Sequence, residues 1–132
     1  MSTFTTKKRL YGNPSQIPAV ANYMVRVFQA EGYEVCVENL NNGCEIYITR
    51  GGLFKAILGL KTALKVTLKP TSDGNISIAT GVSLFKRQLI PTIVALSLFK
   101  PVFITQIWGL IKQAKLDDKA VSVAEAALLQ LT

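Results

Sequence analysis

The stretch "TALKVTLKPTSDGNISIATG", residues 62 to 81, decides the fold of this chain. In its first half, Leu64, Val66 and Leu68 alternate with lysine and threonine. A period of two predicts a β-strand that buries one face. The turn-forming residues "TSDGN" follow, and isoleucine then alternates with serine and alanine. The stretch therefore predicts a β-hairpin with one apolar face and one face that carries lysines.

A second hairpin is predicted upstream, in "YEVCVENLNNGCEIYITR", residues 33 to 50. Its Asn-Asn-Gly centre tolerates the positive φ angles that tight hairpin turns need. If the two asparagines are the central turn residues, one face of the hairpin carries Val35, Val37, Ile46 and Ile48. In that register Cys36 and Cys44 lie on opposite faces, so we expect two reduced thiols and no disulfide.

A helix is predicted before this hairpin, over residues 13 to 32. Asn13 is a suitable N-cap, Pro14 suits the first helical position, and Gln16 occupies the capping-box position. Gly32 is a typical helix stop. Apolar residues recur at helical spacing along one side of the segment: Ile17, Val20, Ala21, Met24, Val27 and Phe28. We therefore expect this helix to pack one face on a sheet.

The order of elements predicts the fold class. Residues 3 to 10, rich in threonine, form an expected edge strand, which gives the order β-α-β-β-β-β. This order is typical of an α+β fold in which an antiparallel sheet of four to five strands carries one helix across it, with two to three C-terminal helices. A chain of this length buries one core, so we expect a single domain over 1–132. Residues 1–81 would form the helix-on-sheet part and residues 82–132 an apolar helical part.

Two prolines divide the C-terminal part, because proline lacks an amide hydrogen and disfavours a helical residue before it. We expect one helix from about 83 to 99, with Pro91 either kinking it or marking its true start. A second helix would run from Pro101 to about 116. A third would begin near Asp117 and Asp118, since acids suit a helix N-terminus.

The segment from residue 89 to 112, "LIPTIVALSLFKPVFITQIWGLIK", is the most apolar part of the chain. It is long enough on paper to span a bilayer core of about 30 Å. Lys100 lies at its middle and Pro101 follows directly, so we expect two short helices that fold back on one another. Their faces are too apolar for one small sheet to cover, which predicts self-association or membrane contact. Complete burial in the chain's own core stays open.

The candidate residues form two sets. The residues expected in self-association or membrane contact are Leu89, Ile93, Leu96, Phe99, Val102, Phe103, Ile107, Trp108 and Ile111. The residues expected to contact an anionic surface are Lys55, Lys61, Lys86, Arg87, Lys100 and Lys112.

The net charge of +7 is concentrated in the middle of the chain, where residues 46 to 116 hold ten lysines and arginines and one acid. Because this part is also the most apolar, the pattern favours an anionic membrane surface over nucleic acid. "GGLFKAILGLK", residues 51 to 61, is either a short interfacial anchor or a crossover between the two hairpins. Nucleic-acid binding through Lys61, Lys65 and Lys69 is a weaker alternative, because such lysines usually form a solvated strand face.

The sequence names no catalytic chemistry. It contains no histidine, which removes the commonest general base, and its eight acids are dispersed. "SLFK" occurs twice and matches S-x-x-K, but the companion motifs of that enzyme class are absent. We therefore expect no enzyme, no cofactor and no metal site. The basic start "MSTFTTKKRL" has no apolar run behind it, so we expect a cytoplasmic protein, with a peripheral position at the inner membrane as the alternative.

Three stretches resemble a bacterial family. They are "AEGYEVCVE", "GGLFKAILGLKTALKVTLKP", and an apolar segment with a central proline that leads into "WGLIKQAKLDDKA". In these features the chain resembles an uncharacterised bacterial α+β domain family, found alone or beside zinc-ribbon or SHOCT modules. The resemblance covers roughly residues 15 to 120 and implies no activity. The leading hypothesis is a non-catalytic homo-oligomeric module, and the alternative is a peripheral membrane-binding module.

Overall fold

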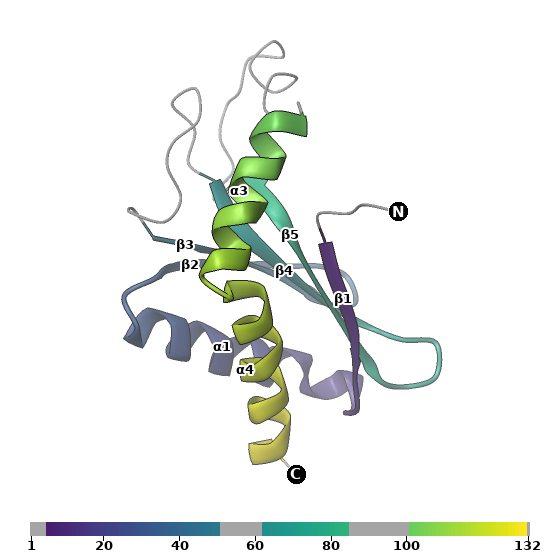
Figure 1. The fold of residues 1–132 in the computed structure, drawn as a ribbon. Helices are drawn as coiled ribbons and strands as arrows, with labels where there is room; N and C mark the ends of the chain where they lie inside the picture. Colours follow the sequence, from purple (N-terminus) through teal and green to yellow (C-terminus); the bar gives the residue numbers. More distant parts are fainter. Residues whose placement is uncertain (1–4, 51–61, 85–100, 132) are drawn as a thin grey trace.

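The computed structural model of the chain describes residues 5–50, 62–84 and 101–131. Its strands are β1 (Thr5–Leu10), β2 (Glu34–Asn39), β3 (Cys44–Thr49), β4 (Thr62–Pro70) and β5 (Ile76–Leu84). Its helices are the short 3-10 helix η1 (Pro14–Gln16), α1 (Ile17–Ala30), α3 (Pro101–Gln113) and α4 (Leu116–Leu131). The five strands form one antiparallel sheet in the order β1-β5-β4-β3-β2 (Figure 1). The predicted α+β fold with this order of elements is confirmed.

The first hairpin has the predicted register. Val35 pairs with Ile48 and Val37 with Ile46. The amide of Leu40 donates to the carbonyl of Gly43 at 2.9 Å, which leaves the two asparagines at the centre of the turn. Both cysteines are free thiols, as expected from their position on opposite faces.

The helical segment begins at Asn13 as the sequence predicts, with η1 leading directly into α1. The side chain of Asn13 accepts from the amide of Ser15, and the amide of Asn13 donates to the side chain of Gln16, which completes a capping box. These bonds satisfy amides that the first helical turn cannot pair. Gly32 has a φ of +92°, which suits the chain reversal into β2.

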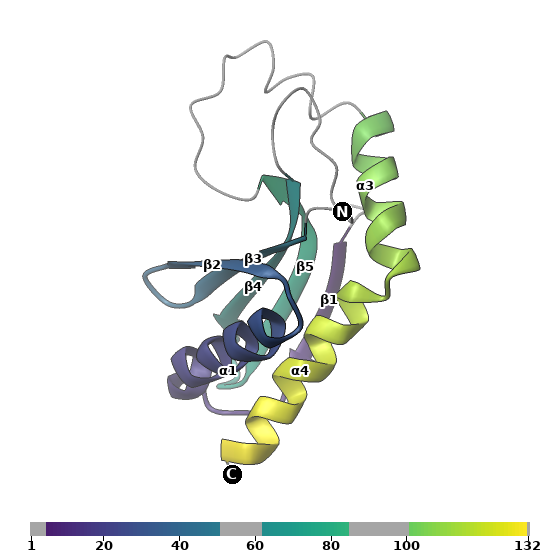
Figure 2. The ribbon, with the colours of Figure 1, turned by 90° about the vertical axis from the view of Figure 1, so that its left-hand side faces the viewer.

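Helices α1 and α4 pack on the same face of the sheet (Figure 2). Helix α1 covers β2, β3 and β4, and α4 crosses it to cover β1, β4 and β5. The core between them contains Val20, Met24 and Phe28 from α1, and the fully buried Ile46, Leu64, Leu68 and Ile78 from the sheet. Full burial of one such side chain contributes about 1.5–3 kcal/mol. The core therefore fixes α1 and α4 firmly on this face, the helix face.

The C-terminal part differs from expectation at its start. Ser83 and Leu84 belong to β5, where Ser83 pairs with Ala63 and Leu84 with Thr62. The predicted helix therefore cannot begin at 83, because the alternation that opens β5 continues past Gly81. The remainder of that predicted helix, including Pro91, lies outside the described residues. The two later helices are present, with boundaries close to the predicted ones.

Candidate functional site

Helix α3 is the described part of the segment that the sequence singles out for contact with a partner. It contacts α4 and β5, and its N-terminal turns extend past the described strands (Figures 1 and 2). At its C-terminal end, Lys115 adopts a left-handed φ of 53°, and α4 begins at the next residue. A single left-handed residue is a common way to end a helix. The chain thus bends sharply between α3 and α4.

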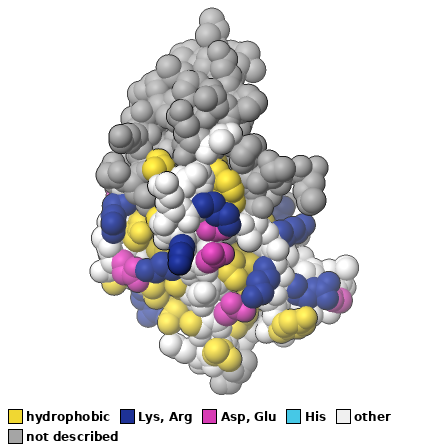
Figure 3. All heavy atoms as spheres, in the orientation of Figure 1, with side chains coloured by type: hydrophobic (Ala, Val, Ile, Leu, Met, Phe, Trp, Pro, Cys, Tyr) yellow, Lys and Arg dark blue, Asp and Glu magenta, His cyan; other side chains and the backbone are white. Residues whose placement is uncertain are grey.

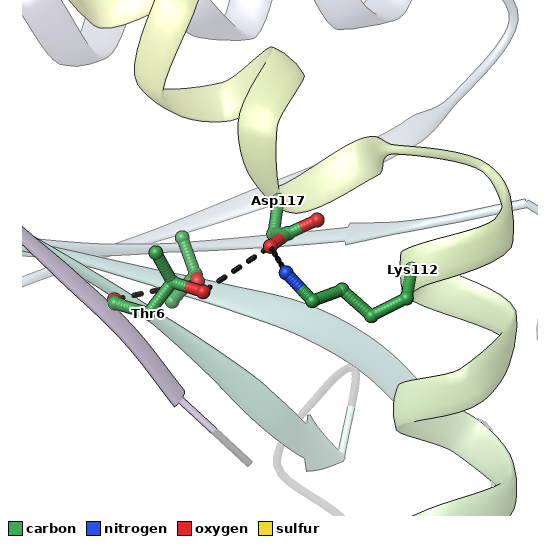
Figure 4. A network of polar contacts seen from close by, with 4 residues as sticks. Thr6, Lys112 and Asp117 are labelled. Carbon is green, nitrogen blue, oxygen red and sulfur yellow. Dashed lines mark hydrogen bonds and ion pairs between the residues drawn. The ribbon is translucent and has the colours of Figure 1, made fainter. Parts of the chain in front are cut away.

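A polar network holds this bend against the sheet (Figure 4). Nζ of Lys112 donates to Oδ2 of Asp117 at 2.7 Å, and Oγ1 of Thr6 donates to the same oxygen at 3.2 Å. The hydroxyl of Thr80 in turn donates to the carbonyl of Thr6 at 3.4 Å. Asp117 is fully buried, whereas half of the Lys112 side chain is exposed. The network therefore places one buried negative charge at the junction of α3, α4 and β1.

Lys112 is less free than the sequence suggests. Its hydrogen bond to Asp117 is the largest influence that raises the pKa of its ammonium group, and the nearby charges of Asp117 and Asp118 act in the same direction. The ammonium also lies 5.4 Å from the centre of the Trp108 ring. Lys112 was predicted to contact an anionic surface, but here it serves an internal ion pair.

The remaining predicted residues divide by location. Trp108 is 9% exposed and Ile111 is fully buried, and both belong to the chain's own hydrophobic core. These two therefore offer little surface to a partner, because the α3–α4 bend turns them toward the core. Val102, Phe103 and Ile107 lie on α3, but their side chains are outside the described part of the structure. The other predicted positions lie outside the described residues altogether: Lys55, Lys61, Lys86, Arg87, Leu89, Ile93, Leu96, Phe99 and Lys100.

Sequence reasoning missed an exposed apolar group at the opposite end of the molecule from the start of α3. Tyr11 is 80% exposed, Leu129 is 76% exposed and Leu131 is 44% exposed. A shallow hollow of about 380 Å³ between the end of β1 and the last turns of α4 includes Tyr11 and Leu129 in its lining. The signal was the pair Leu128 and Leu129, since two consecutive leucines cannot both face the core from one helix.

The sheet face opposite the helix face, here called the polar face, carries most of the charged strand residues. Strand pairing places Lys7 and Arg9 of β1, Lys65 and Lys69 of β4, and Glu45 and Tyr47 of β3 on it. Nζ of Lys65 lies 3.8 Å from Oε2 of Glu45. Tyr47 donates to Oε1 of Glu45 at 2.9 Å. Burial and this hydrogen bond raise the pKa of Tyr47 to about 12.

The surroundings of Cys44 do not activate its thiol as a nucleophile. Burial raises the pKa of the Cys44 thiol to about 11, and the charge of Glu45 adds to the effect. A thiol with a raised pKa is a poor nucleophile at neutral pH. Among the residues that the structure describes, no three histidine, cysteine or acidic side chains are grouped as a metal site would require.

Across the described ranges, no helix is both long enough and apolar enough to cross a bilayer.

Comparison with other proteins gives no family. The chain matches neither any model of a known protein family nor any curated protein sequence.

Proposed function

We propose that the chain is a non-catalytic interaction module that associates with further copies of itself through its apolar C-terminal helices. The observation that carries this proposal is the position of α3. Its last turns reach the core through Trp108 and Ile111, and the backbone of its first turns extends past the strands (Figure 2). Those first turns have the sequence "PVFITQI", in which apolar residues dominate. An apolar helix that leaves its own sheet gains stability when a second molecule covers it.

The core contacts of α3 support a fixed orientation for such an interface. Because Ile111 is fully buried and Lys112 is held by Asp117, the C-terminal half of α3 is anchored. An anchored helix presents its other half without a large ordering cost, which favours association. A second copy of the same helix is the simplest partner, because an interface around a two-fold axis uses the same surface of both molecules.

Light scattering of the protein purified without detergent tests the proposal. We expect a dimer or larger assembly that dissociates when glutamate replaces Val102, Phe103 or Ile107 in single variants. Gln113→Glu is the matched control, because it adds the same charge at an exposed position on the same helix and should leave the assembly intact. Thermal unfolding must show that the dissociating variants remain folded.

Two results would overturn the proposal. One is a detergent-free monomer at every concentration tested. The other is a monomeric protein that floats with vesicles containing anionic lipid. That result would favour the peripheral membrane-binding alternative over self-association. In that case the glutamate variants should lose flotation rather than assembly.

A further inference from the structure

The polar face has a narrow basic strip that the linear sequence does not reveal. Strand β5 runs between β1 and β4, and it contributes only small side chains to this face, namely Ser77, Ala79 and Ser83, with Gly81 between the last two. Ser77 stands between Arg9 on one side and Lys69 on the other. Long basic side chains of β1 and β4 therefore stand on either side of the small side chains of β5, which form the floor of the strip.

The spacing of the strip follows from the sheet. Neighbouring strands lie about 4.8 Å apart, so the two flanking strands are separated by about 10 Å across β5. Along each strand, alternate residues point to the same face at intervals of about 6.7 Å. Lys7 and Arg9 are one such interval apart, and Lys65 and Lys69 are two. Gly81 and Ala63 are buried, so the accessible part of the strip is its end at Ser77 and Ala79, where the width suits one extended chain.

The surface around the lower end of the strip is hollowed. A depression of about 500 Å³ includes Lys7, Arg9, Thr71 and Ser77 in its lining. Arg9 forms an exposed ion pair with Asp73 at 2.9 Å. Lys7 and Lys69 are exposed, and among the described residues neither has an acidic partner. Lys7 and Lys69 are therefore available to an outside anion. Arg9 is paired with Asp73, and Lys65 lies 3.8 Å from Glu45.

The helix face has a different arrangement of charge. Three of its lysines are paired with acids: Lys8 with Glu125, Lys112 with Asp117 and Lys119 with Glu31. Basic and acidic side chains are accordingly intermixed over α3 and α4 in Figure 3. On the polar face the acids Glu34, Glu38 and Glu45 lie on β2 and β3, so the two strands that flank β5 carry only basic charges there.

We propose that this basic strip binds the phosphodiester backbone of nucleic acid without regard to sequence. The occupant is identified by what the strip lacks. A peptide bound along a strand is recognised through pockets that match its side chains, whereas the hollow at Ser77 is lined mainly by basic and hydroxyl side chains, namely Lys7, Lys8, Arg9, Thr71 and Ser77. A membrane surface requires large apolar side chains beside the cations, and the described floor and flanks of the strip have none. Charge and hydroxyl groups alone match phosphate oxygens, which are recognised in this way.

Fluorescence anisotropy with a labelled oligothymidylate, and separately with a duplex of mixed sequence, tests this proposal. We expect binding that weakens as salt is raised, since each phosphate contact contributes a slope of about 0.7 for a single strand in a plot of log affinity against log salt. Lys7→Gln and Lys69→Gln should each reduce the slope by about that amount, which corresponds to about fivefold weaker binding at 0.1 M salt. The stronger of the two probes identifies the source of the backbone.

The chain offers two matched controls. Lys119→Gln removes the same charge from the helix face, where Lys119 is paired with Glu31, and should leave binding unchanged. Asp73→Asn releases Arg9 and should tighten binding. Equal losses from Lys7→Gln and Lys119→Gln would overturn the proposal, because net charge alone would then explain them. So would a failure of both probes to bind while polyglutamate or anionic vesicles do. Because α3 is not part of the strip, Phe103→Glu should keep nucleic-acid binding even if it changes assembly.

Discussion

Asp117 is fully buried, and it accepts a 2.7 Å hydrogen bond from Lys112, five residues earlier in the chain, on the other side of the bend between α3 and α4. The same carboxylate oxygen accepts from Thr6 on β1 (Figure 4). One buried charge thus joins the start of α4 to the end of α3 and to an edge strand. This arrangement holds α3 at a fixed angle to the sheet, which the proposed assembly requires.

The two partners of this pair should respond unequally to substitution. Lys112→Met leaves the buried Asp117 without a counter-charge, and we expect a loss of about 2 kcal/mol in the free energy of unfolding. The loss should fall below the 3–5 kcal/mol typical of fully buried pairs, since Lys112 is half exposed. The double variant Lys112→Met with Asp117→Asn should recover most of it. Urea unfolding of the two singles and the double measures this, and strictly additive losses would show that the pair is not coupled.

The Lys112–Asp117 pair also predicts an alkaline limit of stability. A group whose pKa is higher in the folded state contributes stability that is fully present below its unfolded pKa and is lost as pH rises through the folded value. For Lys112 the loss therefore begins above about pH 10.5. Urea midpoints at pH 9 and pH 11 should differ more for the native chain than for Asp117→Asn.

Tyr47 acts in the same pH range and has to be separated from Lys112. Its pKa is raised to about 12 by burial and by its hydrogen bond to Glu45. Its contribution to the free energy of unfolding therefore also falls as pH rises above 10. Ultraviolet titration of tyrosinate should show a phase near pH 12 that disappears in Tyr47→Phe. Repeating the urea series in the Tyr47→Phe background isolates the effect of Lys112. If that phase persists in Tyr47→Phe, the assignment is wrong.

Local patterns allowed the two hairpins and α1 to be predicted from the sequence. In the first hairpin, the Asn-Asn-Gly turn and the alternation around it determine the pairing of Val37 with Ile46. At η1, which leads into α1, the capping box depends on residues only three apart, so it is visible in the sequence. The end of β5 was misplaced because Gly81 resembles a terminator, although the sheet accommodates it between Thr5 and Lys65.

Long-range contacts could not be predicted, and both functional proposals depend on them. Thr6 and Asp117 are 111 residues apart, and no local pattern links them. The basic strip requires β1 to pair with β5, which brings Arg9 beside Ser77. The sequence singled out Lys65 and Lys69 but could not supply their partners across the sheet. Trp108 and Ile111 looked like surface because helical periodicity does not reveal how the α3–α4 bend orients them.

Two glycines should respond in opposite ways to alanine. At Gly43 an added methyl group would lie 2.1 Å from the carbonyl oxygen of Leu68, so Gly43→Ala should force the backbone of β4 to move. We expect a loss of about 2 kcal/mol or more in the free energy of unfolding. At Gly109 of α3 an added methyl group meets nothing within 4 Å, so Gly109→Ala should stabilise the helix by about 0.5–1 kcal/mol. Thermal unfolding of both variants checks the pair, and a destabilised Gly109→Ala would indicate that a partner approaches α3 closely there.

The two thiols should differ in reactivity. Cys44 is buried and its pKa is raised to about 11, so at pH 8 only a small fraction is thiolate, and the buried position slows access further. Cys36 is partly exposed on the polar face. With a disulfide reagent such as DTNB at pH 8, we expect one thiol to react rapidly and the second only after unfolding in urea. Cys36→Ser should abolish the rapid phase and Cys44→Ser should leave it intact.

Because the pairing in the first hairpin puts the two sulfurs on opposite faces, mild oxidation should give no intramolecular disulfide in the folded chain. A rapid phase that survives in Cys36→Ser would mean that β3 opens readily enough to expose Cys44, and amide hydrogen exchange along β3 would then show correspondingly weak protection.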